Sequence, residues 1–110
     1  MKGKYRSIFI IPSSARRVLG DTGWKFLSPD RISRKIVDAL MTDLALVKSD
    51  AYLGMEEFSG ENAKAIVSLD EQGQVEHIHI RAYADRDIEG ELRSALTTLG
   101  AFTDIEAFSP

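Results

Sequence analysis

The sequence predicts an α+β two-layer sandwich, in which a mostly antiparallel sheet of about five strands carries two helices on one face. One observation is the order of its segments: a strand, an ambiguous stretch, a helix, three strands, a second helix and a last strand. The other is that each helix has one apolar stripe, which is typical of a helix that covers one side of a sheet. The closest architecture is a ferredoxin-like variant with an added hairpin strand.

Residues 5–11 are predicted to form the first strand, because β-branched and aromatic side chains dominate them and a proline follows. This composition is typical of a strand that is buried on both faces near the middle of a sheet. The next stretch, residues 12–28, is ambiguous. Ser13 or Ser14 can cap a short helix that ends at Gly20, before a turn of Asp, Thr and Gly.

Residues 29–47 are predicted to form the first helix. Ser28, Pro29 and Asp30 match a helix start, with an N-cap, a proline in the first turn and an acid that suits the helix dipole. Apolar side chains then recur at helical spacing, at Ile32, Ile36, Leu40, Leu44 and Val47.

Three strands are predicted between the helices, over residues 52–58, 63–69 and 75–84. The polar loop at 59–62 contains a glycine, so we expect the first two of these strands to pair as a hairpin. A second glycine-containing turn, at 70–74, leads into the third strand.

A second helix is predicted to end at Leu99, with Asp85 or Asp87 as its cap and Gly100 directly after its end. Its apolar stripe consists of Ile88, Leu92, Ala95, Leu96 and Leu99. Residues 102–108 supply the terminal strand.

The composition predicts that residues 1–110 form a single α+β domain. The chain is 44% apolar and 28% charged, and a domain of this size can fold without a metal or a disulfide. It has no cysteine, which excludes thiolate chemistry and cysteine-based zinc sites and fits a cytoplasmic location. The apolar run after the basic N-terminus stops at Pro12, too early for a signal peptide or a membrane span.

The net charge of −3 is unevenly distributed along the chain. Residues 1–50 hold ten Lys or Arg and five Asp or Glu, a balance of +5, whereas residues 51–110 hold four and twelve, a balance of −8. Two interpretations remain open. Either the halves interleave in one sheet and neutralise each other, or the acidic half faces a basic protein partner.

Basic residues beside two aromatic rings, Trp24 and Phe26, suggest a nucleic-acid surface in the first half of the chain. The basic residues are Arg16, Arg17, Lys25, Arg31, Arg34 and Lys35. Acids lie among them and the pI is near 5.3, so the sequence argues against nucleic acid as the partner.

The strongest candidate site is a row of side chains on the strand predicted at 75–84. Residues two apart on a strand project to the same face, so four polar side chains share one face: His77, His79, Arg81 and Tyr83. Two imidazoles at this spacing can bind zinc if a carboxylate joins them, or one can act as a general base. No third ligand is identifiable, so the sequence predicts no metal and no cofactor.

Acidic side chains cluster on the predicted hairpins, at Glu56, Glu57, Asp70, Glu71 and Glu76. Such a cluster attracts a basic partner and raises the rate at which it associates. Together with the polar row, these residues form the predicted partner-binding surface, which we expect to be an exposed polar sheet face.

No segment supplies a nucleophile with an adjacent base and an oxyanion hole, so the sequence predicts a non-catalytic protein-binding module. Small size and acidity favour an immunity or antitoxin-type inhibitor that neutralises a basic toxin or nuclease. The alternative is a small-ligand or metal-dependent enzyme domain that uses the face of His77, His79, Arg81 and Tyr83. No membrane partner is predicted.

Overall fold

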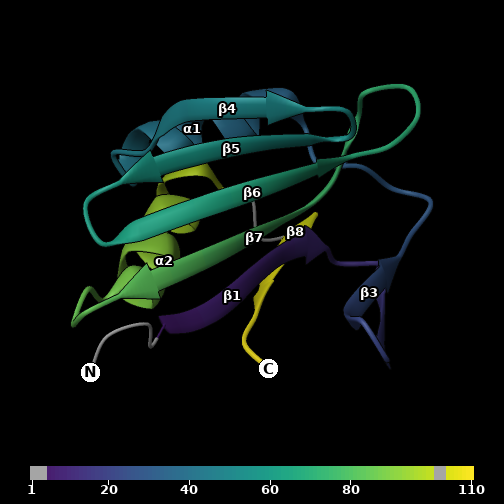
Figure 1. The fold of residues 1–110 in the computed structure, drawn as a ribbon, viewed down its shortest axis with the longest axis horizontal. Helices are drawn as coiled ribbons and strands as arrows, with labels where there is room; N and C mark the ends of the chain where they lie inside the picture. The colour runs from purple at the N-terminus through teal and green to yellow at the C-terminus, as the bar shows by residue number, and fades with distance from the viewer. Residues whose placement is uncertain (1–4, 101–103) are drawn as a thin grey trace.

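Strands dominate the computed structural model of the chain, which describes residues 5–100 and 104–110 (Figure 1). The strands are β1 (Tyr5–Pro12), β2 (Arg16–Gly20), β3 (Gly23–Leu27), β4 (Val47–Tyr52), β5 (Met55–Gly60), β6 (Ala63–Leu69), β7 (Val75–Tyr83) and β8 (Ile105–Phe108). The helices are α1 (Arg34–Asp43) and α2 (Ile88–Leu99). The chain is therefore an α+β fold, as its sequence predicts.

Six strands form one antiparallel sheet in the order β4-β5-β6-β7-β1-β8, and β2 pairs with β3 in a separate two-stranded sheet. Both helices lie on the same side of the large sheet (Figure 1). The antiparallel sheet and the two helices are confirmed. The large sheet has one strand more than predicted, and the separate hairpin was not predicted at all.

The hydrophobic core lies between the large sheet and the helices. Alternate strand residues such as Ile10, Ile78 and Ile80 point into it and are 0% exposed. Leu40 of α1 and Leu92 of α2 meet them and are also 0% exposed. Burial of each such side chain favours folding by about 1.5–3 kcal/mol. Because side chains alternate along a strand, the other residues of β7 project to the side away from the helices.

The ambiguous stretch, residues 12–28, contains a β-hairpin, so the short helix considered at 13–19 is wrong. Strands β2 and β3 are joined by Asp21 and Thr22, and Gly23 follows with a φ of 117°, a conformation that favours glycine. Half-buried and exposed side chains alternate from Trp24 to Leu27 with the period of a strand, and a two-residue turn closes the hairpin.

Helix α1 begins later than the helix predicted at 29–47. Ile32 forms an isolated bridge with Val75 of β7, and its N–H donates to the Val75 carbonyl at 2.9 Å. Ile32 therefore pairs with the sheet and is not part of the helix. Ser28 caps a turn rather than the helix, because its hydroxyl accepts a hydrogen bond from the Asp30 N–H at 3.0 Å.

Helix α1 also ends earlier than predicted, at Asp43. Ala45 adopts a left-handed backbone with a φ of 57°, which a continuous helix does not permit. Residues 47–52 then form β4, an edge strand that is not among the strands predicted from the sequence. All six residues of β4 are exposed, so no alternation of buried and exposed side chains marks them as a strand. The strand predicted at 52–58 is accordingly shifted to β5.

The remaining elements agree with the sequence. β5 and β6 pair as the predicted hairpin, and β7 covers the third predicted strand. In α2, Asp87 caps the start by accepting a hydrogen bond from the Gly90 N–H at 3.1 Å, and Gly100 follows the end with a φ of 62°. β8 is the terminal strand. Residues 102 and 103 of the predicted strand lie outside the described residues.

The oppositely charged halves of the chain interleave, as one of the two interpretations predicts. Among the described residues, five of the nine ion pairs join a base of the first half to an acid of the second. Arg31 lies 2.8 Å from Asp70 and 3.7 Å from Glu76, and Arg34 lies 2.5 Å from Glu56. Partly exposed pairs add little stability individually, but these five pairs engage four of the twelve acids of the second half, namely Glu56, Asp70, Glu76 and Glu106.

We expect Gly60→Ala to lower the free energy of unfolding by about 1–3 kcal/mol. A Cβ on Gly60 would lie 2.5 Å from the Ala45 carbonyl oxygen and 2.8 Å from Leu46 Cδ2, so the backbone must shift to admit it. Urea unfolding of the variant and the wild type measures the loss. Gly20→Ala is the matched control, because its nearest contact would be an ordinary 3.7 Å. An equal loss in both variants would contradict the prediction.

Candidate functional site

The face of the large sheet that points away from the helices carries the predicted polar row, and we call it the open face. The strand register arranges its side chains in rows across β5, β6, β7 and β1. The rows are Ser59, Lys64, Arg81 and Ser7, then Glu57, Ile66, His79 and Phe9, then Met55, Ser68 and His77, with Tyr83 beside Tyr5 at one end. The sequence left open which strands flank β7, and the structure places β6 and β1 there.

The β2–β3 hairpin covers one end of the open face. Phe26 packs on Phe9 and His77, with ring centroids 4.9 and 5.2 Å apart. Trp24 meets Phe108 edge-on at 5.0 Å. Phe9 is consequently only 8% exposed. This end of the face is therefore a second small apolar cluster, and the prediction of a fully exposed polar face is wrong here.

His79 is built into this apolar cluster. Its ring stacks on Phe9, with centroids 4.3 Å apart and planes 16° apart, and its Nε2 lies 3.0 Å from Ser7 Oγ. Burial, together with the charge of Arg81, lowers the pKa of His79 to about 4, and burial also lowers the pKa of His77. Both imidazoles are therefore neutral near pH 7. A pKa of about 4 does not suit a general base that works near pH 7.

The two imidazoles have no third metal ligand within the described residues, where no three His, Asp or Glu side chains lie close enough to hold a metal ion. Their nearest cross-strand neighbours are Ser68, Ile66 and Phe9. A zinc site in a protein needs at least three protein ligands, and these neighbours supply no carboxylate.

Arg81 lies in the middle of the open face, between Ser7 and Lys64. Its guanidinium stacks on the ring of Tyr5, with Cζ 4.9 Å from the ring centroid, and Tyr5 in turn packs against Tyr83 at 5.8 Å. Arg81 Nε is buried without a hydrogen-bond partner. Within the described residues, no carboxylate forms an ion pair with this guanidinium.

The predicted acidic residues of β5 lie on opposite faces of the sheet. Glu57 is on the open face, where its Oε1 lies 3.4 Å from Lys64 Nζ. Glu56 points to the helix side, where its carboxylate lies 2.5 Å from the Arg34 guanidinium and 3.5 Å from Lys48 Nζ. These contacts lower the pKa of Glu56 although partial burial opposes them.

The other three predicted acids lie at the turn between β6 and β7. Asp70 accepts hydrogen bonds from the Arg31 guanidinium at 2.8 Å and from the N–H groups of Gln72 and Gln74 at 2.9 Å, which lower its pKa. Glu76 lies 3.7 Å from Arg31, and Glu71 is exposed. The structure therefore separates the predicted acidic set, and most of its charge is engaged within the fold.

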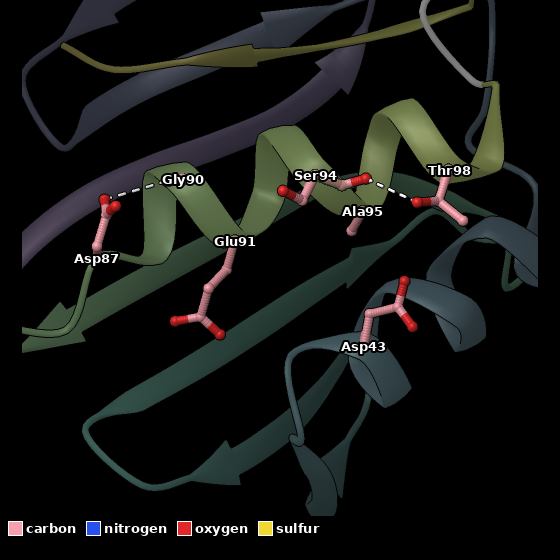
Figure 2. A pocket seen from close by; sticks show the side chains of 7 residues that line it. All are labelled: Asp43, Asp87, Gly90, Glu91, Ser94, Ala95 and Thr98. Carbon is pink, nitrogen blue, oxygen red and sulfur yellow. Dashed lines mark hydrogen bonds between the residues drawn. The ribbon is translucent and has the colours of Figure 1, made fainter.

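A shallow groove of about 600 Å³ lies on the helix side, between α1 and α2 (Figure 2). Its lining residues are Asp43, Asp87, Gly90, Glu91, Ser94, Ala95 and Thr98. Asp87 is occupied as the helix cap, and Glu91 pairs with Arg86 at 2.7 Å. These two carboxylates serve the fold, and Asp43 is the one remaining carboxylate of the lining, so we do not treat the groove as a second candidate site.

No protein-family model and no curated protein matches the chain. Neither of the two helices within the described residues has the length and apolar character needed to cross a bilayer. The function therefore rests on the geometry of the open face.

We expect His79 to make the protein less stable as the pH falls from about 6.5 to about 4. The pKa of His79 is lowered to about 4 in the folded protein from 6.5, so the unfolded chain binds more protons within this window. Stability rises with pH wherever the unfolded state binds more protons, so the penalty is absent above the window and complete below it. Partial solvent exposure reduces its size.

Urea unfolding at several pH values between about 5 and 7 measures this slope, because carboxylates contribute little to it there. His79→Gln is expected to flatten the slope. A slope that the substitution leaves unchanged would contradict the assignment to His79.

Proposed function

We propose that the chain is a non-catalytic protein-binding module that binds its partner through the part of the open face that the hairpin leaves uncovered. The observation that carries the proposal is that no described element covers this side of β5, β6 and the Arg81–Tyr83 end of β7, while both helices lie behind the sheet (Figure 1). It carries side chains of the types enriched in protein interfaces: Tyr5, Met55, Arg81 and Tyr83.

Within this proposal, an immunity or antitoxin-type inhibitor of a basic toxin or nuclease is the class that we favour. The net charge of −3 supports it, as does Glu71, an exposed acid of the β6–β7 turn that forms no ion pair within the described residues. Acids at the rim of a binding surface raise the association rate of a basic partner. Such an inhibitor needs no cofactor, and a cytoplasmic location belongs to the same proposal.

Site-specific photo-crosslinking tests the proposed surface. A photoreactive residue at position 83 or 66, on the open face, is expected to cross-link one protein in native cells. The same residue at position 35, exposed on α1, is the control and is expected to give no product. Cross-links from position 35 alone would overturn the proposal.

The purified partner then provides the quantitative test. We expect Tyr83→Ala to weaken its binding by about tenfold or more, because aromatic residues at the centre of an interface carry much of the binding energy. Lys35→Ala is expected to leave the affinity unchanged. Equal affinities of the Tyr83 variant and the wild type would place the interface elsewhere.

We also propose that the fold is a ferredoxin-like variant. The adjacent strands β8-β1-β7-β6, with α1 after β1 and α2 between β7 and β8, support this, since they follow a β-α-β-β-α-β order once β2, β3, β4 and β5 are counted as additions. An experimental structure compared with known ferredoxin-like domains tests the assignment.

A further inference from the structure

We infer that Arg81 is the receptor for a carboxylate that the protein partner presents to the open face. The inference rests on the proposed function and adds the chemistry of one contact: the partner places an Asp or Glu side chain against the middle of the sheet. Arg81 occupies that position because β7 is an inner strand, with β6 on one side and β1 on the other.

Three hydrogen-bond donors lie in one row across the sheet at this point. Ser7 of β1 and Lys64 of β6 are the direct cross-strand partners of Arg81. A hydroxyl, a guanidinium and an ammonium group all donate to an oxyanion. Directly opposite residues of neighbouring strands lie about 5 Å apart, so a carboxylate bound to Arg81 lies close to both neighbours. Ser7 Oγ already lies 3.0 Å from His79 Nε2 and Lys64 Nζ lies 3.4 Å from Glu57, so Arg81 is the member of the row without a partner among the described residues.

The guanidinium of Arg81 is held in place but lacks an acceptor. Its Cζ lies over the Tyr5 ring, 4.9 Å from the centroid, a contact that favours this position of the guanidinium. Its Nε is buried without a hydrogen-bond partner, which is rare in native proteins. Most other described arginines already pair with a carboxylate: Arg17, Arg31, Arg34, Arg86 and Arg93. The two terminal amino groups of a guanidinium form a fork that binds a carboxylate end-on through two parallel hydrogen bonds, so a partner's carboxylate need not reach the buried Nε.

The surroundings favour a carboxylate over a phosphate. Phosphate sites usually gather several cations, whereas the neighbouring Lys64 is already 3.4 Å from Glu57. Tyr5, Tyr83 and Ile66 give the fork an apolar rim, which suits a side chain delivered by a protein surface. A partner that is basic overall fits both Arg81 and the acidic β6–β7 turn, if it presents one acid to Arg81 and its basic residues to the turn.

Nuclear magnetic resonance of the full ¹⁵N-labelled chain tests the receptor directly. The Nε–Hε signal of Arg81 is identified by its loss in Arg81→Lys. The probes are a hexaglutamate peptide with blocked ends, a hexaglutamine peptide of the same length and inorganic phosphate. We expect the glutamate peptide to shift the Arg81 signal downfield in a saturable way, and the glutamine peptide to shift it little. Arg16, exposed and without an ion pair among the described residues, is the control signal.

Three results would overturn the inference. One is an equal shift of the Arg81 and Arg16 signals, which indicates general ionic screening. Another is saturation by phosphate at a lower concentration than by the peptide. The third is a wild-type dimer in sedimentation that Arg81→Gln converts to a monomer, because the carboxylate would then come from a second copy of the chain.

Binding to the purified partner separates this inference from the proposed function. We expect Arg81→Gln to weaken binding by about tenfold or more, Arg81→Lys to weaken it because the fork is lost, and Arg16→Gln to leave it unchanged. If cross-links map to the open face but Arg81→Gln binds as tightly as the wild type, the carboxylate assignment fails and the proposed function stands. If cross-links map only to the helices while the glutamate response persists, the proposed function fails.

Discussion

Phe9→Ala is expected to lower the free energy of unfolding by about 3–5 kcal/mol and to raise the pKa of His79 at the same time. Phe9 of β1 is 8% exposed because the hairpin covers its side chain. Its ring centroid lies 4.9 Å from that of Phe26 and 4.3 Å from that of His79. Removal of its ring leaves a cavity and admits water to the imidazole. Since burial is the main cause of the lowered pKa of His79, that pKa should move back toward its ordinary value.

Urea unfolding and an NMR titration of His79 measure the two effects. Leu27→Ala is the matched control on the same hairpin, because Leu27 is 55% exposed and its truncation is expected to cost less than about 0.5 kcal/mol. A His79 pKa that stays at about 4 in Phe9→Ala would mean that the charge of Arg81, and not burial, is the main cause.

Arg86→Met is expected to lower the free energy of unfolding by about 2–4 kcal/mol. The Arg86 guanidinium donates to the carbonyl oxygens of Leu44 and Glu61, each at 2.6 Å, and to both carboxylate oxygens of Glu91, at 2.7 and 2.8 Å. It thereby joins the end of α1, the β5–β6 turn and α2. Methionine keeps the apolar stem, so the loss reports the hydrogen bonds rather than the packing.

Urea unfolding measures this loss against Arg93→Met. Arg93 also pairs with a glutamate, Glu89 at 3.1 Å, but its side chain is 75% exposed, whereas that of Arg86 is 16% exposed. An exposed pair contributes less than about 1 kcal/mol, so the control should remain close to the wild type. Similar small losses in the two variants would show that water replaces the hydrogen bonds of Arg86.

The elements that the sequence predicts well carry local signals that depend on few neighbours. β6 and the second half of β7 alternate between buried and half-buried side chains, which is the pattern that periodicity detects. α2 has an acidic cap, Asp87, and a glycine, Gly100, directly after its end, and these mark a helix without knowledge of the fold.

The elements that the sequence predicts poorly depend on contacts made across the fold. Ile32 leaves the predicted helix because it pairs with Val75, which is distant in the sequence. β4 shows no alternation because every residue in it is exposed. Strand β2 of the hairpin is also exposed throughout. Phe26 of its partner strand, β3, is half-buried because it packs on Phe9 of β1.

The part of the candidate site that depends on local spacing was predictable, and the part that depends on distant strands was not. The spacing of His77, His79 and Arg81 places them on one face whichever strands flank them. Their partners depend on the register, so the contacts of Arg81 with Tyr5 and of His79 with Phe9 required the structure. The same holds for the acids, since the ion pairs of Glu56 and Asp70 join distant parts of the chain.

The place of β1 in the sheet has a consequence for how the protein is made. Both neighbours of β1, strands β7 and β8, are translated long after it. While a ribosome is still synthesising the middle of the chain, the apolar side chains of β1 have no strand to pair with. Contacts between residues so far apart in sequence also form slowly, because a long loop must close first. Strand β1 is therefore the part of the nascent chain that most needs protection from aggregation until β7 and β8 have been translated.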